Sequence, residues 1–136
     1  MTTKQRYEGI QTSFQNANLY GCLFLSLLSI AEEYSHEKID FIEAYRRCRS
    51  KGFIDDDFFC KDQEAILYDL TGTKWRKRVM QKLPEIVPDL MYTVEKWYNP
   101  RTDFTHFKRR GFDTLAASVT VREGYIKEYY TYTAEE

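Results

Sequence analysis

The chain has 136 residues, of which 30% are charged, and its formal net charge is −1. This length fits one domain with a sizeable core. The balanced charge gives no electrostatic attraction to nucleic acid or to an anionic membrane, so the sequence disfavours both as partners. We expect a single domain over residues 1–136, with a helical half at about 1–83 and a sheet half at about 84–136.

The N-terminal stretch MTTKQRYEGIQTS is polar and lacks the apolar segment of a secretory signal. The longest apolar run, residues 23–31, is too short to span a bilayer. The sequence therefore predicts a cytoplasmic protein without a membrane segment. Three cysteines without a CxxC pair argue against a disulfide framework and a zinc site, and no motif points to a cofactor.

The first half of the chain is predicted to be helical. A helix over residues 21–34 is apolar around nearly its whole circumference, which indicates burial on most sides. A second helix over residues 37–52 places Ile39, Ile42, Tyr45 and Cys48 on one stripe. It ends at Gly52, and a third helix within residues 60–72 ends at its final glycine.

The second half of the chain is predicted to form strands at residues 74–80, 90–98 and 104–110. Residues 118–133 alternate on both sides of the sequence REGY, which predicts a β-hairpin with Gly124 at positive φ. Helices followed by antiparallel strands indicate an α+β fold.

Cys22 stands at the front of the first predicted helix, directly after Gly21. A helix N-terminus lowers the pKa of a thiol, because its unpaired N–H groups favour the thiolate. Free cysteines are also among the most buried residues, and helix position alone favours a buried Cys22. Cys48 lies late in its helix and Cys60 follows an acidic run, so both are weaker candidates for a nucleophile.

Cysteine catalysis also needs a base, a group that orients the base, and donors for the oxyanion. His36 lies in a polar turn and is expected at the surface, whereas His106 lies between aromatic residues in FTHFKRR. His106 is either a base or a structural histidine, and Asp113 either orients its imidazole or is an ordinary turn residue. The amides of Gln15 and Asn16 are candidate oxyanion donors.

The segment QNANLYGC, the later pair HF and the aspartate of FDTLAAS are together similar to the papain-like cysteine peptidases. By pattern the chain most resembles the double-glycine-leader peptidases of bacteriocin exporters, and its tail resembles small phage-borne proteins of unassigned function. The resemblance implies a papain-like fold, in which a central helix starting at Cys22 packs on a C-terminal antiparallel sheet. It also implies Cys22 as nucleophile, His106 as base, Asp113 as orienting group and Gln15 as oxyanion donor.

Three positions depart from that family pattern. Gln15 is one residue farther from Cys22 than is usual, the strand after His106 continues as FKRRG, and Thr114 replaces the expected proline. Two functions are therefore predicted. The first is a cysteine peptidase or amidase that acts on a peptide or protein substrate. The second is a catalytically degenerate papain-like scaffold that binds a protein partner as a phage inhibitor or adaptor.

In the binding hypothesis, an aromatic hairpin covers the partner through four tyrosines, Tyr125, Tyr129, Tyr130 and Tyr132. A third hypothesis, nucleic-acid binding through KWRKRVMQK, is disfavoured because acidic residues compensate the basic ones.

Overall fold

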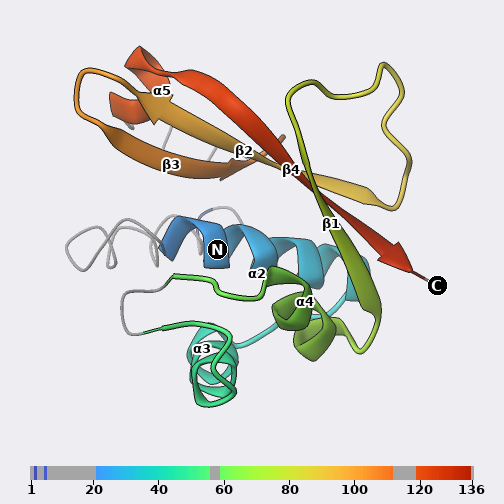
Figure 1. Cartoon of the computed structure of the whole chain (residues 1–136). Helices are drawn as coiled ribbons and strands as arrows, with labels where there is room; N and C mark the ends of the chain where they lie inside the picture. The colour runs from blue at the N-terminus through green and yellow to red at the C-terminus, as the bar shows by residue number, and fades with distance from the viewer. Residues whose placement is uncertain (1, 3–4, 6–20, 56–58, 112–118, 136) are drawn as a thin grey trace.

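The computed structural model describes residues 2, 5, 21–55, 59–111 and 119–135. Three helices come first: α2 (Gly21–Ser35), α3 (Phe41–Ser50) and α4 (Gln63–Thr71). Strands β1 (Lys74–Met80), β2 (Met91–Asn99) and β3 (Phe104–Arg109) follow, and a short helix α5 (Val119–Glu123) leads into β4 (Tyr125–Glu135). The three longer helices lie on one side of the sheet and α5 on the other (Figure 1). The α+β prediction is confirmed.

The sheet has four antiparallel strands in the order β1-β4-β2-β3. Strand β4 lies between β1 and β2, so β1 and β3 are the edges. Because β1 belongs to the sheet, the predicted division near residue 84 is wrong, and the strands begin at Lys74. Pro84 and Pro88 lie in the connection from β1 to β2, which projects from the body of the domain (Figure 1).

Helix α2 is the centre of the hydrophobic core. Phe24, Leu27, Leu28 and Ile30 are fully buried, as the nearly continuous apolar surface of this helix predicts. The helix contacts β2 and β3 on one side and α4 on another. Each leucine buried in this way stabilises the fold by about 1.5–3 kcal/mol relative to an exposed one.

Helices α3 and α4 begin and end at residues that the sequence marks. The Asp40 carboxylate accepts a hydrogen bond from the Glu43 N–H and caps α3, and Asp62 caps α4 in the same way. Gly72 ends α4 at φ 75°, a left-handed conformation that glycine adopts without strain.

The predicted apolar stripe of α3 is wrong at one position. Ala44 and Cys48 are buried, and the rings of Phe41 and Tyr45 lie 5.6 and 6.2 Å from the Phe24 ring of α2. Ile42, however, is 59% exposed. The helix turns its Phe41–Tyr45–Cys48 side toward α2, which leaves Ile42 facing solvent.

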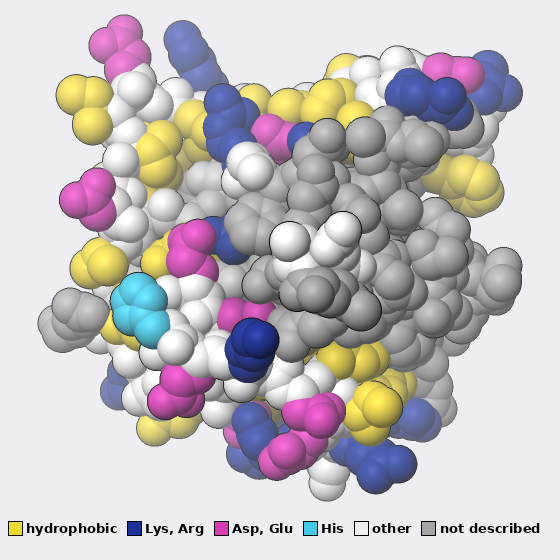
Figure 2. Space-filling view, turned by 180° about the vertical axis from the view of Figure 1, so that it is seen from behind, with side chains coloured by type: hydrophobic (Ala, Val, Ile, Leu, Met, Phe, Trp, Pro, Cys, Tyr) yellow, Lys and Arg dark blue, Asp and Glu magenta, His cyan; other side chains and the backbone are white. Residues whose placement is uncertain are grey.

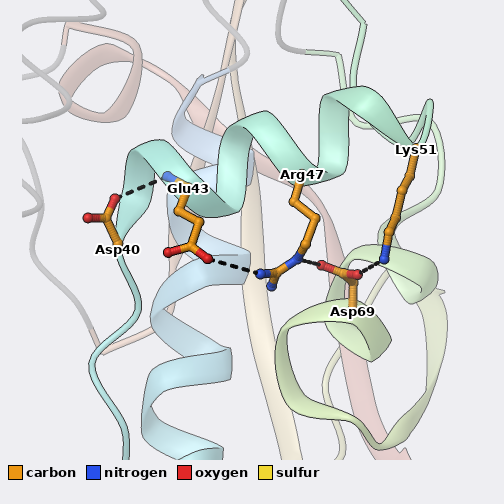
Figure 3. Close-up of polar contacts among 5 residues, drawn as sticks. All are labelled: Asp40, Glu43, Arg47, Lys51 and Asp69. Carbon is orange, nitrogen blue, oxygen red and sulfur yellow. Dashed lines mark hydrogen bonds and ion pairs between the residues drawn. The ribbon is translucent and has the colours of Figure 1, made fainter.

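One carboxylate joins α3 to α4. The Asp69 side chain of α4 is 6% exposed. Its carboxylate accepts hydrogen bonds from Arg47 Nε of α3, at 2.5 Å, and from the Nζ of Lys51, the residue that follows α3 (Figure 3). Burial alone raises the pKa of Asp69, but the hydrogen bonds from Lys51 and Arg47 outweigh it and hold the pKa below its usual value. These ion pairs hold α3 against α4, and α3 lies on the side of α2 away from the sheet (Figure 1).

The predicted hairpin at residues 118–133 is wrong, because residues 119–123 form α5 and only β4 is a strand. Gly124 is not among the residues at positive φ. A Cβ there would lie 2.2 Å from the Thr120 carbonyl oxygen and 2.4 Å from that of Tyr98. Glycine is therefore required because the backbones of α5 and β2 approach this position closely. Strand β4 does not pair with the residues just before it but with β1 and β2.

Candidate functional site

Cys22 lies in the first turn of α2 and is 7% exposed. Its Sγ accepts a hydrogen bond from the backbone N–H of Phe107, with an N–S distance of 3.4 Å. Phe107 is on β3, which is an edge strand among the strands that the structure describes. The outward N–H groups of an edge strand are not paired within its sheet. The cysteine thus satisfies an edge-strand donor and links α2 to the sheet.

Burial raises the pKa of Cys22 to about 11 and outweighs the opposing effect of the hydrogen bond from Phe107. Burial likewise raises the pKa of Cys48 to about 11 and that of Cys60 further still. All three are free thiols. At neutral pH each of them is protonated, including the one at the helix N-terminus.

The register of the sheet decides which way His106 points. Its neighbour Phe107 belongs to the core, and Arg109 donates to Ser29 Oγ and Glu33 on α2, at 3.3 and 2.7 Å. Side chains alternate along a strand, so Phe107 and Arg109 share the α2-facing side and His106 lies on the opposite side.

His106 is paired across the sheet with Trp97 and is 9% exposed. Its Nε2 is buried and has no hydrogen-bond partner in the part of the chain that the structure describes. Burial, together with the smaller effect of the nearby Lys108 charge, lowers the pKa of His106 to about 4. The imidazole is therefore neutral at pH 7, on the face of β3 away from the α2-facing side chains.

Two of the four predicted catalytic residues are thus described. The Cys22 Sγ meets β3 at the Phe107 N–H, and the His106 side chain points to the face of that strand opposite to the Phe107 side chain. Asp113 and Gln15, together with the alternative donor Asn16, lie outside the described residues. His36 is exposed at the end of α2, as predicted, and has φ 58°.

Sequence reasoning missed a group of polar and aromatic side chains on the α2-facing side of the sheet. The group lies at the border of the core, near the end of α2 that carries Cys22. It consists of Lys77, Lys96, Phe107, Glu128 and Tyr130, and we call it the lysine–tyrosine cluster. Lys77 Nζ lies 4.2 Å from the centre of the Tyr130 ring. Lys96 Nζ lies 5.9 Å from the rings of both Tyr130 and Phe107. The available signal was the position of Lys77 in KWRKRVM, two residues after Trp75 and therefore on the same face of the strand.

The two lysines of the cluster differ in their electrostatic surroundings. Lys96 forms an ion pair with Glu128 at 3.3 Å. Burial opposes the charge of Lys96, but Tyr130 and Glu128 outweigh it and raise its pKa. For Lys77 burial dominates and lowers the pKa, despite the carboxylates of Glu128 and Glu64. Among the described residues no carboxylate lies within ion-pair distance of the Lys77 ammonium group.

The tyrosines of the C-terminal segment do not form the single surface that the sequence predicts. Tyr132 is fully buried, Tyr130 is half-buried in the cluster, and Tyr129 is half-buried on the other side of the sheet. Only Tyr125 is largely exposed, at 53%. Alternation along β4 distributes these side chains over both faces.

Acidic and basic side chains are interspersed over the described part of the face shown in Figure 2. This agrees with the balanced composition of the chain and gives that face no extended track for a polyanion. Within the described ranges, no three His, Cys, Asp or Glu residues are grouped so that they could hold a metal ion. None of the helices described is long and apolar enough to cross a membrane.

No protein-family model, curated protein or solved structure matches this chain.

Proposed function

We propose that this protein is a peptide- or protein-binding module on a papain-like scaffold, in which Cys22 has a structural role. The observation that carries the proposal is the contact between Cys22 Sγ and the Phe107 N–H. A buried thiol with a pKa of about 11 is a poor nucleophile at neutral pH. The histidine that would activate it is neutral and belongs to the opposite face of β3.

The papain-like part of the proposal rests on chain order and packing. A buried helix with a cysteine in its first turn packs on an antiparallel sheet, and the histidine follows on a strand of that sheet. This is the arrangement that the family resemblance implies. A degenerate member of such a fold keeps the helix–sheet packing, which the core requires, after the catalytic groups have separated.

The surface best suited to a partner lies beside Cys22. The lysine–tyrosine cluster combines apolar ring surface with two ammonium groups. Aromatic side chains are enriched at protein interfaces, and an ammonium group can form a charge-assisted hydrogen bond with a carboxylate of the partner. Position also favours it, since the cluster lies on the α2-facing side of the sheet, where the scaffold holds its cysteine.

Affinity capture with the full chain tests this proposal. We expect a partner retained by the wild-type protein to be retained equally by Cys22→Ser and His106→Ala variants, because neither group acts chemically. A partner that is cleaved by the wild type, or that is held only by the Cys22→Ser variant, is a substrate and contradicts the proposal.

A cysteine peptidase or amidase is the second candidate, and one contact favours it: Cys22 Sγ touches the backbone of the residue next to His106. In this mechanism His106 takes the proton of the Cys22 thiol, and the thiolate attacks an amide carbon. The C–N bond then breaks as His106 gives the proton to the leaving amine, and water hydrolyses the thioester. Asp113 orients the imidazole, and Gln15 and the N-terminus of α2 stabilise the oxyanion. A thiol-reactive probe would then label Cys22 well ahead of Cys48 and Cys60, and His106→Ala would slow that labelling.

A further inference from the structure

We propose that the lysine–tyrosine cluster binds a single carboxylate of an acidic peptide segment whose neighbouring side chains are apolar. This inference rests on the proposed binding function and names the chemistry of its partner. The carboxylate lies against the ammonium group of Lys77, and the apolar neighbours lie on the ring of Tyr130.

The geometry of the cluster comes from all four strands of the sheet. Lys77 of β1 lies over the face of Tyr130 of β4, and Lys96 of β2 lies within reach of the same ring. The Tyr130 ring, which forms the aromatic floor of the cluster, lies 5.6 Å from the buried ring of Phe107 on β3, which supports it from the core. Phe107 is also the residue whose N–H binds Cys22, which places the floor at the N-terminal end of α2.

The charges within the cluster leave one position for an anion. Lys96 already has the Glu128 carboxylate as its ion-pair partner, at 3.3 Å. Lys77 is half-buried, and no described carboxylate is paired with its ammonium group. The exposed Glu64 carboxylate of α4 accepts from the Lys77 backbone N–H at 3.1 Å and does not reach the ammonium group within ion-pair distance. A half-buried ammonium group that lacks a paired anion is stabilised when a ligand supplies one.

The same charges favour a carboxylate over a phosphate or a nucleic-acid backbone. Within the cluster the ammonium groups of Lys77 and Lys96 face the carboxylate of Glu128, and Glu64 acts on Lys77 from beyond ion-pair distance. One added carboxylate can therefore pair with Lys77, whereas a phosphate dianion or a polyanion would meet stronger repulsion from both glutamates. The cluster also lacks the arginine forks that bind phosphate in a bidentate manner. Aromatic rings beside the lysines add affinity for apolar side chains, which a peptide provides.

The test compares two blocked peptides, acetyl-Leu-Glu-Leu-amide and acetyl-Leu-Gln-Leu-amide, on the full chain carrying carbon-13 in its lysines. Binding is followed by the NMR signals of the lysine side-chain carbons, which the Lys77→Met and Lys96→Met variants assign. We expect the glutamate peptide to shift the Lys77 and Lys96 signals saturably. The glutamine peptide should bind about tenfold more weakly, because it lacks the charge that pairs with Lys77.

Variants on opposite faces of β1 provide the matched control. Lys77→Met, which keeps the length of the side chain without its charge, should weaken the glutamate peptide about tenfold. Arg78→Met removes an exposed charge from the next residue, on the other face, and should leave binding within about twofold. The comparison of the two peptides uses the wild-type chain, so it stands even if Lys77→Met fails to fold.

Equal binding of the two peptides, or no shift at Lys77, overturns the inference. Inorganic phosphate or a thymidine oligonucleotide that binds the cluster more tightly than the glutamate peptide overturns the carboxylate assignment. These results are distinguishable from failure of the proposed function. A reactive Cys22 would contradict the proposed binding function without changing the Lys77 signals. A captured partner that binds the Lys77→Met variant as well as the wild type would contradict only the assignment of this site.

Discussion

The sulfur of Cys22 accepts a hydrogen bond from the Phe107 N–H at 3.4 Å, and this contact joins the first turn of α2 to the edge of the sheet. The cysteine that would be the nucleophile of a papain-like enzyme is here a buried acceptor. Its partner strand carries His106 one residue earlier, on the other face.

Replacing Cys22 tests the structural value of that contact. Cys22→Ala removes a buried sulfur and leaves the Phe107 N–H without its acceptor, so we expect the free energy of unfolding to fall by about 1–3 kcal/mol. Cys22→Ser keeps an acceptor and should lose less. Urea denaturation measures both changes, and an unchanged stability of Cys22→Ala would show that the contact is unimportant.

His106 makes stability depend on pH. Its pKa is about 4 in the folded protein, below the usual 6.5, so between these values the unfolded chain binds a proton that the folded protein does not. Stability should therefore fall as the pH falls through this window, by an amount on the order of 3 kcal/mol. Urea denaturation between pH 7 and pH 4 measures the slope.

His106→Phe should flatten that slope and leave stability at pH 7 unchanged or slightly higher, because it removes a buried nitrogen without a partner. The control is His36→Asn, at an exposed position with φ 58° that asparagine tolerates. It should keep the wild-type slope. A His106→Phe protein with an undiminished slope would show that another group is responsible.

The Asp69 contact should be a separate source of stability. Asp69→Asn breaks the pairs with Arg47 and Lys51, and we expect a loss of about 1–2 kcal/mol at pH 7. Since the folded-state pKa of Asp69 is lowered, its contribution is present above the usual carboxyl pKa and is lost as the pH falls through the lowered value. The variant and the wild type should then converge in acid.

Glu43→Gln is the matched control for Asp69, since its carboxylate faces the same Arg47 at 3.8 Å but is 75% exposed. We expect a change within about 0.5 kcal/mol, because exposed pairs contribute little. Equal losses for the two variants would mean that the burial of Asp69 does not matter.

Gly124→Ala should be strongly destabilising, by about 3 kcal/mol or more, since its Cβ would overlap two backbone oxygens that cannot move freely. Gly52→Ala provides the comparison. Its Cβ meets nothing within 4 Å, and the cost of its φ of 78° should be about 1 kcal/mol. Thermal unfolding of the two variants ranks them, and a milder Gly124→Ala would contradict the close approach of α5 to β2.

Much of the fold follows from local patterns in the sequence. The apolar surface of α2, the glycine that ends α4 and the segment KWRKRVM each predict an element close to its observed bounds. The alternation of Val119 and Val121 before REGY predicts the first strand of a hairpin, whereas residues 119–123 form α5, which packs against β2 and β3.

The site could be predicted only in part. Cys22 at the start of a buried helix is a local feature, whereas the direction of His106 depends on the register of β3, and a shift of one residue reverses it. The lysine–tyrosine cluster joins residues 77, 96 and 130, and only the non-local order of the sheet brings them together.

The rate at which Cys22 is alkylated by iodoacetamide, followed against pH by mass spectrometry of the native full chain, tests the central claim most directly. We predict slow labelling at neutral pH, a rise only toward the thiol pKa of about 11, and no effect of His106→Ala. An inflection below pH 7 that disappears in His106→Ala would show a thiolate activated by its histidine, and would contradict a structural role for Cys22.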